Sequence, residues 1–424
     1  MIFDVRDYGA VGDGKTLNTK AIQACIDACA AAGGGRVLLE NGVYVSGTVR
    51  LKSFIDFHIA SNATFLGSEK CEDFPSMTDH THIDPEKCPR NGSSCFILAE
   101  EAENVSLSGM GKIDGNGQHF IKPKENNHQA HWKKYERIGP QTPPRVVFFC
   151  GCRHARIENI GIYNSPSGWA FWIHDCDDVV IHGVTVDSNL EYPNNDGIHI
   201  NCSRDVAVSD CNIKASDDAL VVRANSVTLK ENKVCERVSI SNCNLISHCG
   251  GIRIGWLRDG VVRNCTFSDL SITDTRDGVL ITFPWRGPDA IPDEGREDSV
   301  IENISFHNIV MDRIHNHPIH IKVDDHENTR NRIGSIDKLY FTGIRCRGLK
   351  FPSLEGSARY PLSEITFTDC TFDREDRTEE YGPLEFRDEE VRFTEVLGKE
   401  MFAHVNDLTL NNTRFRDLRK KAQK

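Results

Sequence analysis

The sequence predicts an all-β protein in the form of a parallel β-helix, with one helix capping its N-terminal end. Three observations support this fold class. A short strand-like motif recurs along the chain, a second set of strand segments shares fixed aliphatic positions, and an amphipathic segment near the start ends at a run of glycines. The chain has 424 residues, of which 39% are hydrophobic, so it can bury a long core.

The first element expected along the chain is a capping helix over residues 18–32. In "NTKAIQACIDACAAAGGG" (18–35), Asn18 can cap the helix, the apolar residues share one face, and the glycines stop it. The preceding "GAVGDGKT" (9–16) satisfies the phosphate-binding pattern G-x-x-x-x-G-K-[ST]. The α/β alternation that such a loop requires does not follow, so we interpret these residues as a glycine-rich turn. The apolar face consists of Ile22, Cys25, Ile26 and Cys29.

The recurring motif reads apolar, any, small or Asn/Asp, apolar, any, apolar. Its copies are β-branched, alternating and too short to be helices, which indicates strands. Stacked coils that bury a common interior form a parallel β-helix. The copies are "ARIENIGI" (155–162), "VVIHGVTV" (179–186), "VAVSDCNI" (206–213), "VSISNCNL" (238–245), "GVVRNCTF" (260–267), "ISFHNIVM" (304–311), "LYFTGIRC" (339–346), "ITFTDCTF" (365–372) and "LTLNNTRF" (408–415).

The motif also accounts for part of the sixteen cysteines. Cys211, Cys243, Cys265 and Cys370 occupy the position that Ile160 holds in its own copy. A free cysteine behaves as a small buried hydrophobe, so we expect these thiols inside the solenoid, which fits a reducing compartment. A disulfide or metal ladder is the alternative.

A second column of strands is expected from residue 196 onward. Its segments are "DGIHIN" (196–201), "DALVVR" (218–223), "GGIRIG" (250–255), "DGVLIT" (277–282) and "HPIHIK" (317–322). The third and fifth residues of each are aliphatic and should point inward, because strand side chains alternate. The fourth and sixth residues should form an outward face with several cations: His199, Asn201, Val221, Arg223, Arg253, Leu280, Thr282, His320 and Lys322.

Composition narrows the class of protein. The net charge of −12 argues against a nucleic-acid partner. No run approaches the roughly 18 apolar residues of a membrane span, so we expect no membrane partner. "MIFDVRDYGA" (1–10) shows no secretory signal, so we expect a cytoplasmic protein, or a secreted one if a leader was removed. We expect a single β-helix domain over 1–424, with loop insertions at 117–145 and 283–300.

The aspartates at the heads of two segments carry the candidate chemistry. Asp196 and Asp218 occupy equivalent places on adjacent strands, about 4.8 Å apart, and Asp217 lies beside them. Three clustered acids raise the pKa of at least one of them, and an acid separated from a base is what glycoside hydrolysis requires. The alternatives are aspartates that only bind turn backbone, and a Ca²⁺ site.

These segments resemble a known family. "FDVRDYGAVGDGKTLNTKAIQACIDAC" (3–29), "GKIDGNGQ" (111–118), "NSP" (164–166), "NNDGIHI" (194–200) and "SDDALVVR" (216–223) are similar to glycoside hydrolase family 28. That is the polygalacturonase family of right-handed parallel β-helices, which act on pectin. The resemblance covers nearly the whole chain. The N-terminal string is shared with some lyase-like and phage β-helix proteins, so it indicates fold more strongly than activity.

The resemblance implies an inverting mechanism with three aspartates. Asp217 would be the general acid that protonates the leaving oxygen. Asp196 and Asp218 would together activate the attacking water. Asn194 would orient the substrate, in a motif where Asn195 replaces the family's Thr.

Two motifs of the family are not kept. Its G-H-G aligns with "CGG" (249–251), which puts Gly250 at the histidine position and leaves His248 as a candidate substitute. Its R-I-K, which binds the substrate carboxylate, aligns with "LIT" (280–282), and Leu280 cannot bind a carboxylate. A guanidinium offers a planar fork to a carboxylate. The substitute substrate-binding residues that we expect are His199, Arg223, Arg253, His320 and Lys322, with Trp256 as an aromatic platform beside Trp285 and Arg286.

The sequence therefore predicts an inverting glycoside hydrolase acting on pectic or other uronic-acid-containing oligosaccharides. The insertion at 117–145, with His128, His131, Trp132, Lys133 and Lys134, could wall off one end of the cleft and favour exo-attack. We expect no metal and no cofactor, and the set Cys71, His80, His82 and Cys88 matches no standard zinc spacing. A neutral-sugar hydrolase, a β-helix lyase or epimerase, and a non-catalytic carbohydrate-binding β-helix remain alternatives, and the oligomeric state stays open.

Overall fold

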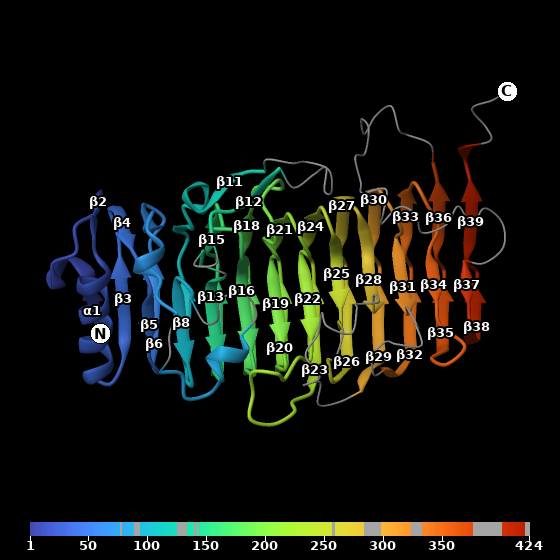
Figure 1. Ribbon diagram of the computed structural model, residues 1–424, viewed down its shortest axis with the longest axis horizontal. Coiled ribbons are helices and arrows are strands. Elements are labelled where there is room, and N and C mark those ends of the chain that lie inside the picture. Colours follow the sequence, from blue (N-terminus) through green and yellow to red (C-terminus); the bar gives the residue numbers. More distant parts are fainter. Residues whose placement is uncertain are drawn as a thin grey trace.

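The alternating segments form the coils of a parallel β-helix in the computed structural model (Figure 1). The structure describes residues 1–76, 79–88, 94–124, 134–139, 142–143, 145–256, 259–283, 298–323, 333–375 and 401–419. Three parallel sheets run along the solenoid, two of 13 strands and one of 11. The hand is right-handed, as expected for parallel crossovers.

Sheet A and sheet B follow one another in every coil. Sheet A consists of β1 (Ile2–Asp4), β3 (Gly35–Leu39), β6 (Ile55–Ile59), β9 (Ser106–Ser108), β14 (Arg153–Glu158), β17 (Asp177–His182), β20 (Arg204–Ser209), β23 (Cys235–Ser241), β26 (Val261–Ser268), β29 (Ser299–His307), β32 (Ile333–Thr342), β35 (Leu362–Thr368) and β38 (Val405–Asn411). Sheet B consists of β2 (Asp13–Leu17), β4 (Gly42–Ser46), β7 (Ala63–Gly67), β10 (Lys112–Asp114), β15 (Gly161–Tyr163), β18 (Thr185–Asp187), β21 (Asn212–Ala215), β24 (Asn244–Ser247), β27 (Ser271–Thr275), β30 (Val310–Ile314), β33 (Arg345–Gly348), β36 (Thr371–Arg374) and β39 (Arg414–Asp417).

Sheet C carries the second predicted column. It consists of β5 (Val49–Leu51), β8 (Ile97–Glu100), β13 (Arg145–Cys150), β16 (Trp169–His174), β19 (Ile198–Asn201), β22 (Leu220–Arg223), β25 (Gly250–Ile254), β28 (Asp277–Phe283), β31 (Ile319–Val323), β34 (Ser353–Glu355) and β37 (Phe402–Ala403). The predicted register is confirmed, because the aliphatic residues at the third position pair along the sheet in the order Ile198, Leu220, Ile252, Val279 and Ile319.

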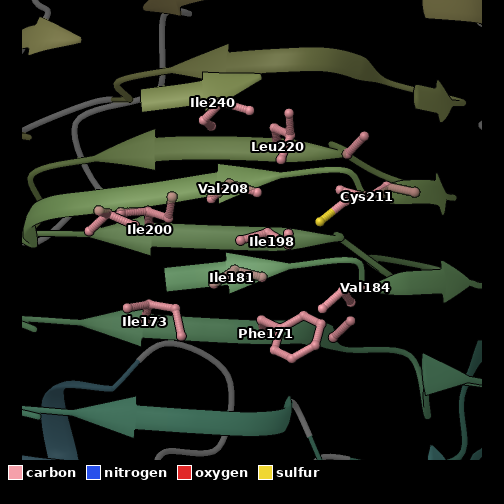
Figure 2. Close-up of a cluster of buried hydrophobic side chains, with 14 of the residues drawn as sticks. Phe171, Ile173, Ile181, Val184, Ile198, Ile200, Val208, Cys211, Leu220 and Ile240 are labelled. Carbon is pink, nitrogen blue, oxygen red and sulfur yellow. The ribbon is translucent and has the colours of Figure 1, made fainter. Parts of the chain in front are cut away.

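The core lies between the three sheets, along the whole axis of the solenoid. Figure 2 shows a section of it, in which Phe171, Ile198 and Leu220 of sheet C point into the same interior as Val208 and Ile240 of sheet A. All five side chains are at most 1% exposed. Burial of such side chains stabilises a fold by roughly 1.5–3 kcal/mol each, so stacking of coils is the main source of stability.

The cysteines follow the core, with one correction. All sixteen are free, and Cys211, Cys243 and Cys370 are buried at the start of a sheet B strand as expected. Cys265 is also buried, but it lies within β26 and pairs with Ile304 of β29. Leu270 takes the place equivalent to Cys243, because Ser271 after it pairs with Asn244. The copy of the motif therefore begins five residues later than the spacing at 260–267 predicts, with Leu270 in place of Cys265.

The N-terminal helix α1 (Thr19–Ala31) caps the solenoid, as predicted within one residue at each end. Its four expected apolar residues are all fully buried. Asn18 stands before the helix but makes no side-chain cap bond. Instead its amide donates to the carbonyl of Thr16 and its oxygen accepts from the Val11 N–H, which ties the glycine-rich turn to the helix.

The glycine-rich turn is not a phosphate loop. Part of it is strand β2, and the carboxylate of Asp13 accepts the backbone N–H groups of Lys15 and Thr16 at 2.9 and 2.8 Å. Those are donors that a phosphate would need. The acid therefore occupies the position where an anion would bind.

The remaining elements are short. The insertion at 117–145 contains the antiparallel hairpin β11 (Ile121–Pro123) and β12 (Tyr135–Arg137), while residues 125–133, with His128, His131, Trp132 and Lys133, lie outside the described part. So do residues 284–297 of the second insertion, with Trp285 and Arg286. Four 3₁₀ turns complete the described elements: η1 (Val5–Tyr8), η2 (Cys71–Asp73), η3 (Pro85–Lys87) and η4 (Gly117–Phe120). Within the described residues, no helix is long and apolar enough to cross a membrane.

Candidate active site

The candidate site lies where three successive coils pass from sheet B into sheet C, in the middle of the solenoid (Figure 1). The connections β18–β19, β21–β22 and β24–β25 carry Asp196, Asp217 with Asp218, and Cys249 with Gly250. Backbone bonds hold these rungs in line: Gly197 N–H donates to the Asp218 carbonyl at 2.9 Å. The same ladder that buries the aliphatic column therefore places the acids side by side.

Asp218 is the most firmly held of the three acids. It is 5% exposed, and one carboxylate oxygen accepts the Gly250 N–H at 2.9 Å. The other oxygen accepts from Nε of Arg253, which is also buried. Burial acts to lower the pKa of Arg253, but the neighbouring charge of Asp218 outweighs it and raises that pKa above its ordinary value. The Asp218 carboxylate is therefore fixed in place by a guanidinium on one side and a backbone N–H on the other.

Asp217 is set differently, although it is the adjacent residue. It is half-buried, and its carboxylate accepts from the side-chain amide of Asn194 at 2.8 Å. Asn194 adopts a left-handed backbone conformation with φ of 55°, which lets it turn back over the next coil. The amide orients this carboxylate without adding a positive charge.

Asp196 lies on the preceding coil and is 6% exposed. Its carboxylate oxygen is 3.6 Å from Nδ1 of His199, which is itself 3% exposed. The His199 ring lies against Trp169, with ring centroids 3.9 Å apart. The predicted residue His199 is therefore a partner of Asp196 in a buried aromatic setting.

Three residues at the site were not predicted from the sequence. Cys249 places its sulfur and the carboxylate oxygens of Asp217 and Asp218 all within 4.8 Å of one another. Its sulfur accepts from Arg253 at 3.7 Å and from Arg276 at 3.4 Å, and burial raises the pKa of the thiol well above its usual value. The thiol is therefore neutral and lies between two guanidinium groups.

Arg276 and Asp277 form the wall on the C-terminal side. Nε of Arg276 donates to the fully buried Asp277 at 2.9 Å. Burial acts to raise the pKa of Asp277, but the charges of Arg276 and His320 lower it below its ordinary value. A sequence signal existed, because Asp277 pairs with Gly250 in the same column as Asp218 and heads its segment in the same way.

The predicted cations do not all converge on the acids. Arg253 does, but Arg223 makes a two-pronged ion pair with the buried Asp259 at 2.8 and 2.7 Å. The Arg223 guanidinium is therefore held by Asp259, and its part in substrate binding stays a prediction. Lys322 lies 4.0 Å from Glu355, two coils beyond Arg253.

Three other predicted residues have defined partners. His320 lies 3.3 Å from Asp277, in register with Leu280, which is buried at 2% exposure. His248 is within 3.2 Å of the Leu190 carbonyl, on the loop that also carries Asn194. Trp256 is half-buried and lies against the Arg253 guanidinium at 4.7 Å, so part of the expected aromatic platform is used to hold that arginine.

Gly250 explains why the histidine of the resemblance is missing. A Cβ at this position would lie 2.8 Å from a carboxylate oxygen of Asp218 and 3.3 Å from the side chain of Leu280. A side chain could therefore enter only by displacing that carboxylate. Gly250 and Leu280 pack together here, in place of the histidine and the arginine that the resemblance implies.

The donor sets do not fit a metal ion. Asp217, Asp218 and Cys249 could offer three ligand atoms, but Arg253 and Arg276 donate to the same sulfur and their positive charges oppose a cation. In the second set, His80 lies 3.0 Å from Glu100 and His82 lies 2.8 Å from Asp175. Both histidines therefore lie against carboxylates.

The site thus brings Asp217, Asp218 and Cys249 together at the entry to sheet C of a parallel β-helix. The model of the family described as glycosyl hydrolases family 28 matches residues 45–373. The chain belongs to this family and is a glycoside hydrolase.

Several known proteins are similar to it. A probable polygalacturonase of Arabidopsis thaliana is 24% identical over 336 residues, 72% of this chain and 67% of that protein. An exopolygalacturonase of Platanus acerifolia is 27% identical over 72% of this chain and 73% of its own length. For further polygalacturonases of Arabidopsis thaliana and Vitis vinifera, the match spans 46% and 55% of their length.

Solved structures agree on the fold. A hyperthermoactive exopolygalacturonase from Thermotoga maritima superposes with a TM-score of 0.72 at 20% identity, over 98% of this chain and 92% of that chain. A family 28 exopolygalacturonase from Yersinia enterocolitica has a TM-score of 0.69 at 17% identity, over 98% and 78%. At these identities the likeness shows the shared β-helix.

Proposed function

We propose that this protein is an inverting, exo-acting hydrolase of pectic or other uronic-acid-containing oligosaccharides. The observation that carries the proposal is the unequal environment of two adjacent acids. Asp218 is buried and held by Arg253 and a backbone N–H, whereas Asp217 is half-buried and accepts from the Asn194 amide. Glycoside hydrolysis with inversion needs one carboxyl group that gives a proton and one that takes a proton, and two acids in unlike surroundings can divide these roles.

The roles follow from that difference. Asp217, the more accessible of the two adjacent acids, donates a proton to the leaving glycosidic oxygen. Asp218 and Asp196 take a proton from the attacking water. The water attacks the anomeric carbon as the glycosidic bond breaks, so the free sugar leaves with inverted configuration.

The uronide preference rests on the guanidinium groups beside the acids. Arg253 and Arg276 both donate to Cys249, so two cationic side chains border the space over Asp217 and Asp218. A guanidinium recognises a carboxylate with a planar fork. The names of the relatives, polygalacturonase and exopolygalacturonase, support the same substrate class.

Exo-attack is supported by the hairpin β11–β12. Lys134 pairs with Glu191 at 2.5 Å, and the Tyr135 ring meets Tyr192 edge-on at 5.3 Å. Arg137 donates to the Ser167 carbonyl at 2.9 Å. The hairpin is thereby fastened to the loop that carries Asn194 and Asp196, where it can form a wall at one end of the substrate path.

Hydrolysis of a defined oligogalacturonide, followed by NMR of the anomeric protons, tests the proposal. The product should first appear in the anomeric configuration opposite to that of the cleaved bond. A retained configuration would exclude direct displacement by water, and an unsaturated product absorbing near 235 nm would indicate a lyase. The stereochemical outcome must be measured, because the oxygens of Asp217 and Asp218 lie within 4.8 Å of each other, closer than the roughly 6.5–9.5 Å usual for inverting enzymes.

A neutral sugar in one subsite is the second candidate. Val221 and Leu280, both buried and apolar, flank Arg253 in the outward column of sheet C. Leu280 stands where the resemblance expects a carboxylate-binding arginine. If the neutral candidate holds, kcat/KM for an oligosaccharide with one neutral unit should exceed that for the matched all-uronide substrate.

A further inference from the structure

An open groove with a volume of about 540 Å³ lies on the outward face of sheet A, near the N-terminal end of the solenoid. Its volume falls within the roughly 300–1,000 Å³ typical of small-molecule sites. It is formed over β3, β6, β9 and β14, whereas the three aspartates lie at the entry to sheet C. The residues that the argument uses are Arg36, Asp56, His58, Ser108, Met110 and Glu158.

Successive coils place the polar side chains of this groove in two columns. Arg36, Asp56 and Ser106 pair in register along one column. His58 and Ser108 pair in the other, two residues further on. Arg36 Nε donates to Asp56 at 2.7 Å, and the Ser106 hydroxyl donates to the other Asp56 oxygen at 3.0 Å.

The hydrogen bonds fix the protons on His58. Ser108 has one hydroxyl proton, which it donates to Asp56 at 2.5 Å. The 2.8 Å contact between Ser108 and His58 Nδ1 must then be donated by the histidine. A neutral imidazole that carries its proton on Nδ1 has an accepting lone pair on Nε2. Burial lowers the pKa of His58 below its ordinary value, so the ring is neutral at pH 7.

The same assignment excludes a Ser–His nucleophile here. A serine nucleophile must give its proton to the histidine base. Ser108 gives its proton to Asp56 instead, so the pair is arranged for binding.

The charges in the groove select against an anionic ligand. Asp56 and Glu158 contribute two carboxylates, while Arg36 contributes one guanidinium that Asp56 already engages. Hydroxyl groups match what the groove offers: His58 Nε2 and Glu158 accept, and the remaining N–H groups of Arg36 donate. Met110, which is 76% exposed, offers an apolar contact to the C–H face of a sugar ring.

We propose that this groove is a second carbohydrate site, which binds a neutral saccharide on a face separate from the aspartates. The inference does not rest on the proposed reaction. A hydrolase with such a site can hold a neutral portion of a branched glycan while its acids act on another part.

The methionine methyl groups report on the groove directly. The chain has five methionines, of which Met110 lies at the groove and Met311 is 1% exposed in the core. In protein labelled with ¹³C-methyl methionine, galactotetraose should shift the Met110 signal saturably in the millimolar range and leave Met311 unchanged. Met110→Leu assigns the signal. An unmoved Met110 signal, or one that moves with tetragalacturonate but not with galactotetraose, would overturn the proposal.

Two variants test the recognition. His58→Ala removes the Nε2 acceptor and should weaken galactotetraose binding by about three- to tenfold, the value of one hydrogen bond. His182→Ala is the matched control, because His182 follows Glu158 in the same column and contacts Ser209 at 3.0 Å but does not line the groove. Equal binding by the two variants would contradict the proposal.

A third variant keeps the proposal testable if His58→Ala does not fold. Glu158→Gln keeps the shape of the groove and removes a charge-bearing acceptor, so binding should fall severalfold even if His58→Ala proves unstable. Hydrolysis of short oligogalacturonides should be unchanged in all three variants. A protein that binds galactotetraose but cleaves no glycoside would separate failure of the proposed function from failure of this site.

Discussion

The guanidinium of Arg253 and the carboxylate of Asp218 form a buried ion pair beside the other two acids. Such a pair fixes the position of the carboxylate. The consequence concerns catalysis, because a base that loses its buried partner is no longer held in line with the water that it activates.

For Arg253→Ala we therefore expect kcat on an oligogalacturonide to fall by about 10²-fold, because the carboxylate of Asp218 loses the contact that orients it. Steady-state kinetics on a defined oligogalacturonide measure this loss. Arg253→Lys restores a charge without the planar fork and should recover part of the rate. A raised KM with an unchanged kcat would assign Arg253 to substrate binding alone.

Asp217→Asn tests the role of Asp217 as the general acid. The amide keeps the shape and the contact with Asn194 but carries no transferable proton, so kcat should fall by about 10²–10⁴-fold. KM should change little. An aryl glycoside whose leaving group needs no proton provides the control, because it should retain most of its rate. Equal losses on both substrates would indicate a structural role.

Prediction from sequence worked for side chains that strand alternation places. Asp218 and Arg253 follow from two columns of residues, and the structure pairs them, while Asp196 lies on the adjacent rung, where the Gly197 N–H bonds to the Asp218 carbonyl. Prediction from sequence could not give the partner of Arg223, because Asp259 lies between β25 and β26, where no pattern repeats. Cys249 and Arg276 were missed because they stand on connections between strands, where alternation says nothing about direction.

At the scale of single elements, the strands of sheet C owe their stability to the aliphatic ladder. Ile252 is fully buried between Leu220 and Val279 in adjacent rungs. Ile252→Ala should lower the free energy of unfolding by roughly 2–5 kcal/mol, the usual cost of such a cavity. Urea unfolding followed by circular dichroism measures it. Outward-facing Thr282→Ala serves as the control, and a loss below 1 kcal/mol for Ile252→Ala would contradict the ladder.

The capping helix shows which features of an element can be predicted from the sequence and which cannot. Its extent and buried face could be predicted, because they depend on the spacing of apolar residues within one segment. The role of Asn18 could not. Its amide can donate and accept, and it is used on Val11 and Thr16 because the glycine-rich turn passes beside it. The hydrogen-bond partners of the Asn18 side chain therefore depend on how the turn folds beside it.

At the scale of the whole molecule, the anchored hairpin β11–β12 makes a prediction about how polymer is cleaved. An enzyme whose substrate path is closed at one end removes units from chain ends. The viscosity of polygalacturonate should therefore fall slowly while reducing ends accumulate. Viscometry run beside a reducing-end assay distinguishes the modes. Lys134→Ala with Tyr135→Ala removes two hairpin contacts and should speed the viscosity loss per bond cleaved. A rapid early fall in the parent protein would contradict exo-attack.

The sixteen free thiols have a mechanical consequence. No sulfur bridge joins one coil to a distant one, and strands in the three long sheets bond only to the rungs on either side. Under tension applied at the two ends, such a stack has no covalent shortcut to bear the load, so it should peel apart rung by rung. Force spectroscopy should then record a series of small extensions in place of one large rupture, and the trace should be the same with or without a reducing agent.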